Sequence, residues 1–213
     1  MILIDDAGSG SLVGGTLIGL LRVETKEFYS EVIPIKLYNQ NNFEKKHYLS
    51  YTTDIVKRAF KHLNVEKDEN VHICRGYMFD DVRKYFAENN ILYEDAKIED
   101  PLQSLIEGSF EDYVVTLGLP RNYIKFTKYP FHFHRLLRWI YADYTNRSKL
   151  CKTGWKSWQK YSNLKVKTYT DTVYTNNYYC LKCGKKINRS SSVKVIEYVS
   201  NMPNTIYLHK TCP

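Results

Sequence analysis

The sequence lacks a long apolar run, and this absence limits what the protein can be. Its longest strongly apolar stretch, 12–21, contains three glycines and a threonine and ends at Arg22. It is too short to cross a bilayer. Asp5 and Asp6 stand where a signal peptide would carry its basic residues. We therefore expect no membrane interaction and no export signal, and a cytoplasmic location.

Cysteine is scarce and odd in number, with five residues among 213. Without an expected export signal, this count argues against a disulfide framework and for reduced thiols. Wholesale disorder is excluded, because 43% of the residues are hydrophobic. The length suits one domain of about 150 residues with a small appendage.

Acidic residues are nearly missing from the last third of the sequence. Residues 144–213 contain 13 Lys/Arg and 2 Asp/Glu, whereas residues 1–143 contain 18 and 21. This asymmetry predicts a polyanionic partner, most commonly nucleic acid, and a merely solubilising basic surface is the alternative. Aromatic residues lie among the lysines, and rings stack on bases while ammonium groups neutralise phosphates. The candidate nucleic-acid contacts are Lys149, Lys152, Trp155 and Lys156.

Hydrophobic periodicity predicts an α/β domain. Alternation indicates strands within 2–6, 12–23, 27–37, 71–77 and 91–98. Helical spacing indicates helices within 43–63, 80–86, 101–117 and 132–144. The order β-β-β-α-β-α-β-α-α implies a mixed sheet with helices on its faces. We expect this domain to span 1–145, a basic aromatic connector to span 146–177, and a zinc-binding module to span 178–213.

Two adjacent acids end the first predicted strand. The segment Ile4-Asp5-Asp6-Ala7-Gly8-Ser9-Gly10 resembles the opening of type 2 ribonucleases H, in which such a strand precedes a glycine–x–glycine turn. That family usually has a basic residue between the two glycines, where this chain has Ser9. The element order is similar to that of the wider ribonuclease H-like superfamily, which includes junction resolvases and transposases. The resemblance implies a nuclease that uses Mg²⁺ or Mn²⁺ to hydrolyse phosphodiester bonds in RNA or DNA.

Asp5 and Asp6 are the first candidate ligands of the catalytic ions. Successive side chains of a strand point to opposite faces, so both reach one pair of ions only if the strand ends or bends after them. Gly8 and Gly10 permit such a bend. The alternative is a pair of solvated turn acids beside a hairpin.

Further catalytic ligands must come from later elements. Glu107 lies in a segment that faintly resembles the apolar–glutamate–x–x–phenylalanine segment of bacterial junction resolvases. Asp143 stands on a late helix, where the resemblance implies the fourth ligand. Asp80 is either a ligand or a helix-capping residue. His132 and His134 are expected to be structural, with protonation of a leaving group as the alternative.

Cysteine and histidine form a metal-ligand pattern near the end of the sequence. A C-x2-C pair followed by Gly184 is separated by 25 residues from an H-x2-C pair. Four nitrogen and sulfur ligands in two close pairs suit tetrahedral, structural Zn²⁺. The pattern resembles treble-clef zinc fingers, and a hairpin of 193–199 with 205–208 is expected between the pairs. The predicted ligands are Cys180, Cys183, His209 and Cys212.

Three classes of function fit these observations. The favoured hypothesis is a metal-dependent nuclease with a structural zinc ion. The second is a non-catalytic nucleic-acid-binding zinc protein on a ribonuclease H-like fold, which would tolerate loss of Asp5 and Asp6. The third is an adaptor whose zinc module binds a protein partner, and it predicts no affinity for nucleic acid at moderate salt.

Overall fold

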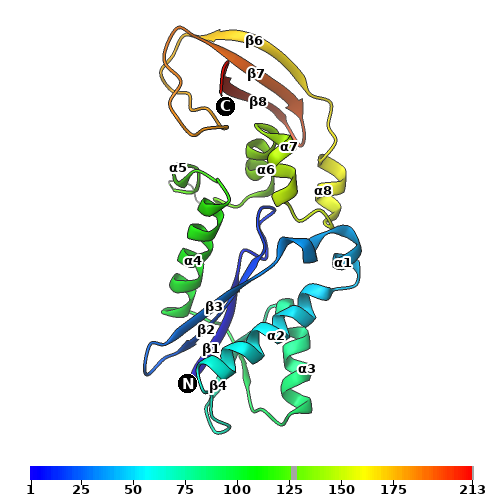
Figure 1. Cartoon of the computed structure of the whole chain (residues 1–213), viewed down its shortest axis with the longest axis vertical. Helices are drawn as coiled ribbons and strands as arrows, with labels where there is room; N and C mark the ends of the chain where they lie inside the picture. The colour runs from blue at the N-terminus through cyan, green and yellow to red at the C-terminus, as the bar shows by residue number, and fades with distance from the viewer. Residues whose placement is uncertain (126–128, 213) are drawn as a thin grey trace. The chain divides into compact units, whose positions relative to one another are not determined.

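The computed structural model describes residues 1–125 and 129–212, and the chain divides into two compact units (Figure 1). Unit 1 comprises residues 1–10, 14–116 and 152–155. Unit 2 comprises residues 11–13, 117–151 and 156–213. Pro213, the last residue of the predicted zinc module, lies outside the described residues. The predicted boundaries after residues 145 and 177 stay predictions.

Unit 1 is built on a five-stranded mixed sheet in the order β3-β2-β1-β4-β5. Its strands are β1 (Ile2–Ala7), β2 (Thr16–Arg22), β3 (Phe28–Ile33), β4 (Val71–Cys74) and β5 (Glu94–Ala96). The first three form an antiparallel meander, while β4 lies parallel to β1 and β5 parallel to β4. The predicted α/β class with a mixed sheet is therefore confirmed.

Helices cover both faces of this sheet (Figure 1). On one face, α2 (His47–His62) and α3 (Asp80–Glu88) pack on apolar side chains of β1 and β2, such as Ile4 and Ile18. On the other face lies α4 (Leu102–Thr116), whose Ile106 side chain approaches Gly19 of β2 so closely that a Cβ there would lie 2.7 Å from it. Short helical segments complete unit 1: η1 (Ile35–Tyr38), α1 (Gln40–Glu44) and η2 (Tyr77–Phe79).

The predicted helix over 43–63 is interrupted near its start. Lys46 has a left-handed backbone with φ of 55°, which ends the short helix α1 and lets α2 begin at His47. The predicted helix over 132–144 is also shorter than expected. Asp143 has φ of −153° and ψ of 65°, so a non-helical residue separates the two helices on either side of it.

Unit 2 combines short helices with a three-stranded antiparallel sheet in the order β6-β7-β8. The strands are β6 (Lys167–Val173), β7 (Ser191–Val199) and β8 (Pro203–His209). The helices are α5 (Arg121–Ile124), α6 (Phe133–Tyr141), α7 (Tyr144–Arg147), η3 (Ser148–Leu150) and α8 (Lys156–Tyr161). The predicted hairpin is confirmed as β7–β8, and β6 adds a strand from the segment expected to be a connector.

The two units differ strongly in charge. Unit 1 contains 14 Lys/Arg and 20 Asp/Glu, a net charge of −6. Unit 2 contains 17 Lys/Arg and 3 Asp/Glu, a net charge of +14. Among the residues the structure describes, no helix is both long enough and apolar enough to span a membrane.

Candidate functional sites

The four predicted zinc ligands lie together in unit 2. Their ligand atoms are all within 4.8 Å of one another. Cys180 Sγ lies 3.7 Å from Cys212 Sγ, and Cys183 Sγ lies 3.3 Å from His209 Nδ1. Within residues 1–125 and 129–212, no other group of three or more His, Cys, Asp or Glu side chains gathers this closely.

A tight turn orients the first ligand pair. Gly184 adopts φ of 74°, a left-handed conformation that favours glycine, and its N–H donates to the Cys180 carbonyl at 2.7 Å. Burial raises the pKa of Cys180, but backbone N–H groups of Cys183, His209 and Lys182 outweigh it and bring that pKa to about 7. N–H groups that point at a sulfur favour the thiolate, which is the form that binds a metal.

The His209 ring is held in the orientation a metal ligand needs. Its Nε2 lies 3.2 Å from the Lys186 carbonyl oxygen, which can only accept a hydrogen bond. The proton is therefore assigned to Nε2, and the lone pair of Nδ1 faces the cysteines. Three thiolates and one imidazole suit tetrahedral Zn²⁺ and use all four of its positions, so this group fits a structural rather than a catalytic ion.

A buried arginine anchors the same turn to the helices of unit 2. Arg147 donates from Nη1 to the carbonyls of Trp139 (2.6 Å) and Leu181 (2.8 Å), and from Nη2 to that of Lys182 (2.7 Å). Its guanidinium also lies over the Trp139 ring, 4.1 Å from the centroid. The Cys180–Cys183 turn is thus fixed to α6 and α7 by a residue that no metal pattern reveals.

The predicted catalytic acids begin with Asp5, at the carboxyl end of central strand β1. Asp5 pairs with Gly19 across the sheet, on the face that α4 covers. Burial raises the pKa of Asp5 and the Glu107 carboxylate adds to that rise, while hydrogen bonds from the Cys74 thiol and the Asp6 N–H oppose it. The effect of Glu107 is the smallest of these, and the described residues form no three-ligand group around Asp5.

Asp6 has different surroundings, as strand alternation requires. It pairs with Ile18, whose side chain packs on the α2 face. Burial raises the pKa of Asp6 to about 6, and the Asp5 charge adds to this, while hydrogen bonds from Ser9 and the charge of Lys152 oppose it. The turn after β1 does not bring the two aspartates into one three-ligand cluster among the described residues.

Lys152 departs from its predicted role at a nucleic-acid surface, because its side chain is fully buried in unit 1. The ammonium donates to the carbonyls of Gly8 (2.6 Å) and Ser9 (3.3 Å) and to Thr16 Oγ1 (3.2 Å). Burial lowers the pKa of Lys152 to about 7, although Asp6 raises it. A lysine whose three protons are all donated to the protein is not available to a phosphate.

The other predicted nucleic-acid contacts are divided between the units. Lys149 and Lys156 are exposed and belong to unit 2, whereas half-buried Trp155 belongs to unit 1 with Lys152. Trp158 is buried and stacks parallel to Tyr144, with an interplanar angle of 4°.

The remaining predicted acids lie at the surface or in unit 2. Glu107 is exposed on α4 and accepts a hydrogen bond from Gln103 at 3.2 Å. Asp143 lies in unit 2, where the Asn146 amide donates to both of its oxygens. Asp80 is the first residue of α3, so Phe79 rather than Asp80 stands at the cap position, and Asp80 pairs with Arg83 at 3.3 Å.

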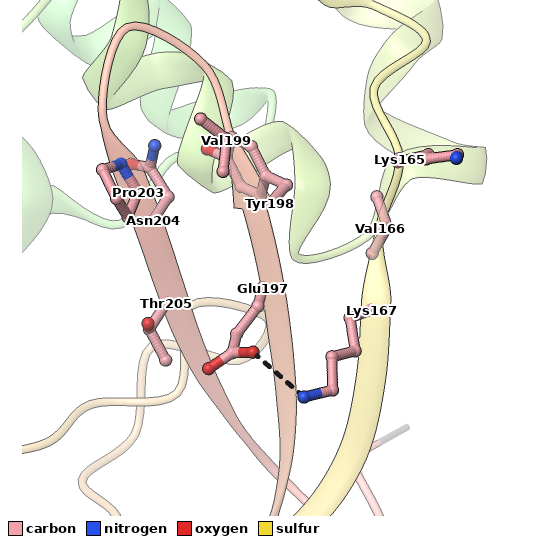
Figure 2. A pocket seen from close by; sticks show the side chains of 9 residues that line it. All are labelled: Lys165, Val166, Lys167, Glu197, Tyr198, Val199, Pro203, Asn204 and Thr205. Carbon is pink, nitrogen blue, oxygen red and sulfur yellow. Dashed lines mark ion pairs between the residues drawn. The ribbon is translucent and has the colours of Figure 1, made fainter.

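Unit 2 contains several cavities, two of which are lined by charged side chains. One, of about 780 Å³, is lined by Lys165–Lys167, Glu197–Val199 and Pro203–Thr205 (Figure 2). Its only carboxylate, Glu197, already pairs with Lys167 at 3.8 Å, as Figure 2 shows. The other, of about 510 Å³, is lined by the first turns of α6 and by residues of β8, and it contains both His132 and His134.

Comparisons with known proteins assign no role to these sites. No protein-family model matches the chain, and no curated protein is significantly similar to it.

Proposed function

We propose that the protein is a ribonuclease H-like nuclease that hydrolyses phosphodiester bonds in RNA or DNA with Mg²⁺ or Mn²⁺. The observation that carries this proposal is the placement of Asp5 toward the carboxyl end of the central strand, on the face covered by α4, the helix that carries Glu107. An antiparallel meander continued by parallel strands, with helices on both faces, supports the ribonuclease H-like assignment.

The carboxylates of unit 1 have the chemistry that such ions need. Asp5 and Glu107 would hold a hard divalent cation through their oxygens, whereas Asp6 lies on the opposite face of the sheet and would reach the same ion only around the end of the strand. A bound ion of this kind activates water and stabilises the leaving oxygen. Lys152 holds the Gly8–Ser9 turn rigid through two carbonyls, which fixes the end of β1. Asp143 belongs to unit 2, and the site proposed here consists of unit 1 residues only.

A second candidate function is nucleic-acid binding without cleavage. Lys152 favours it, because the buried ammonium already places a positive charge beside Asp6. Asp6 then has an electrostatic partner inside the protein and needs no cation. The zinc group and the basic unit 2 would serve this function as well as the first.

Cleavage assays with matched variants distinguish the two candidates. The substrates are a labelled single strand, a duplex, an RNA–DNA hybrid and a four-way junction, each with Mg²⁺ or Mn²⁺. We expect Asp5→Asn and Glu107→Gln to abolish cleavage. Glu111→Gln, one turn further along α4, is the control and should retain it. If the wild type does not cleave and all variants bind the nucleic acids equally well, the second candidate, nucleic-acid binding without cleavage, is supported instead.

A further inference from the structure

The 510 Å³ cavity of unit 2 is lined by positively charged side chains without any acidic residue among them. Arg135 and Arg138, three residues apart on α6, both line it together with His134, and none of its lining residues is acidic. We call it the arginine pocket. In a unit of net charge +14, it gathers cationic side chains inside a concave surface rather than on a solvated helix face.

Among the described residues, the two guanidinium groups donate to neutral backbone carbonyls. Arg135 Nη2 donates to the Tyr123 carbonyl at 2.6 Å, and Arg138 Nη2 donates to the Thr205 carbonyl at 2.9 Å. The Arg135 guanidinium also lies over the Tyr123 ring, 4.1 Å from its centroid. These contacts hold both side chains in place but leave their positive charges without a counter-charge in the pocket wall.

Several buried polar atoms beside the pocket have no hydrogen-bond partner within the described part of the chain. They are the Nε atoms of Arg135 and Arg138 and the Nδ1 atom of His134. These atoms are themselves covered, so a ligand in the pocket would be met by the parts of the two arginine side chains that line the pocket. Guanidinium groups bind phosphate oxygens in pairs, which makes a phosphate the matching anion.

Tyrosine rings also line the pocket. Tyr178 and Tyr207 are half-buried, with ring centroids 4.4 Å apart, and Tyr179 is 56% exposed. Aromatic rings next to cationic groups are the combination with which proteins hold unpaired bases of a nucleic-acid strand. Asn177 and Asn201, also in the lining, offer amides to base edges. The cavity of Figure 2 lacks this combination, because its lining contains no arginine and its one aromatic residue, Tyr198, is buried.

We propose that the arginine pocket binds one phosphate and an adjoining base of a single-stranded nucleic acid, the phosphate at Arg135 and Arg138 and the base on Tyr178 and Tyr207. The proposal rests on the proposed function only in taking nucleic acid as the partner, and it does not require cleavage. The sequence favoured the segment 149–156 as the principal contact with nucleic acid. The proposal places that contact at the pocket lined by residues of α6 and β8 instead.

The test measures binding of a fluorescein-labelled ten-thymidine strand in zinc-containing buffer without Mg²⁺ or Mn²⁺. We expect Arg135→Gln and Arg138→Gln to weaken binding roughly tenfold or more, since each removes a charge-assisted contact. Arg189→Gln removes the same charge from an exposed position of unit 2 and should weaken binding about twofold or less. Equal weakening by all three variants would overturn the proposal, because it would indicate diffuse attraction.

Two further measurements keep the test independent of folding and of cleavage. A strand carrying 5-iodouracil should photo-crosslink to Tyr178 or Tyr207 in the wild type, and crosslinks confined to other residues would overturn the proposal. Thymidine monophosphate and inorganic phosphate should compete only weakly; competition as strong as that of the strand would show a mononucleotide site instead. Cleavage that persists in Arg135→Gln, with unchanged strand binding, would refute the pocket while leaving the nuclease proposal intact.

Discussion

The two units of this chain are stabilised by different means. Unit 1 has a sheet covered on both faces, with a continuous apolar cluster that includes Ile4, Ile18, Val56 and Phe86. Unit 2 has a three-stranded sheet, short helices and a charge of +14, and it combines buried apolar side chains such as Leu136, Trp139 and Val195 with the predicted zinc ligands and the Arg147 anchor. The comparison teaches that an acidic unit held by apolar packing and a basic unit that also depends on polar anchors should respond to different perturbations.

The sharpest test of this difference is removal of the metal. Chelation of zinc, or Cys183→Ser, should unfold unit 2 and leave unit 1 folded, because structural zinc sites contribute about 10 kcal/mol or more of folding free energy. Hydrogen exchange resolved by peptide should show loss of protection in β7 and β8 but not in β1 and β2. Cys74→Ser, in unit 1, is the control and should leave the zinc content unchanged. Simultaneous loss of protection in both units would contradict the comparison.

The next largest effect should follow from Arg147→Met. The substitution keeps an apolar stem but leaves three buried carbonyls without a donor, so we expect the free energy of unfolding of unit 2 to fall by about 4 kcal/mol. Urea unfolding monitored by hydrogen exchange of unit 2 measures it. Arg189→Met, at the surface, should cost about 0.5 kcal/mol or less. Similar losses for the two variants would mean that Arg147 does not anchor the zinc turn.

Unit 1 should instead be sensitive to packing at the turn after β1. Gly8 has φ of 81°, and a Cβ there would collide with the ring of Phe110. Gly8→Ala should therefore lower the stability of unit 1 by about 3 kcal/mol. Gly10→Ala is the matched control, because a Cβ at Gly10 meets nothing within 4 Å. Thermal unfolding of the zinc-loaded protein compares them, and equal melting temperatures would contradict the described turn.

The smallest expected effect is a pH dependence confined to unit 1. The pKa of Asp6 is raised from 3.8 to about 6, so between these values the native state holds a proton that the unfolded chain has released. Stability should fall by about 2 kcal/mol as the pH rises from 4 to 6. Asp6→Asn should flatten this limb, whereas Asp54→Asn at the surface should not.

Lys152 has the opposite effect above this range. Its pKa is lowered from 10.5 to about 7, so above pH 7 the native state holds fewer protons than the unfolded chain and stability rises with pH. Urea unfolding at a series of pH values, followed by NMR signals of the unit 1 core, measures both limbs. A flat profile between pH 4 and 9 in the wild type would contradict the burial of both groups.

Much of unit 1 could be predicted from the sequence, because its strands and helices carry strong periodic patterns. The strand β6 could not, since its burial pattern is mostly exposed and offers no apolar alternation. The break at Lys46 was hidden for a similar reason, because a single left-handed residue leaves no mark on hydrophobic spacing. Local patterns are visible in a sequence, and an edge strand or an isolated backbone turn is not.

The candidate sites could likewise be predicted only where a local sequence pattern marks them. The zinc ligands were predictable because they come in two close pairs with a spacing that few other functions require. The burial of Lys152 was not, since its acceptor Gly8 is 144 residues away and nothing near Lys152 distinguishes it from the exposed lysines around it. Arg135 and Arg138 were missed because charged residues on an amphipathic helix ordinarily face solvent. Which charges turn inward depends on the tertiary fold.

The Lys152 contacts also set an order of events during protein synthesis. Unit 1 consists of residues 1–10, 14–116 and 152–155, so its last segment is synthesised after residues 117–151 of unit 2. Ribosomes add about 5–20 residues per second, so about 2–8 seconds separate the two. During that interval the turn at Gly8 lacks its ammonium donor. Until the segment 152–155 is synthesised, the nascent sheet lacks the Lys152 contact that fixes the turn after its amino-terminal strand.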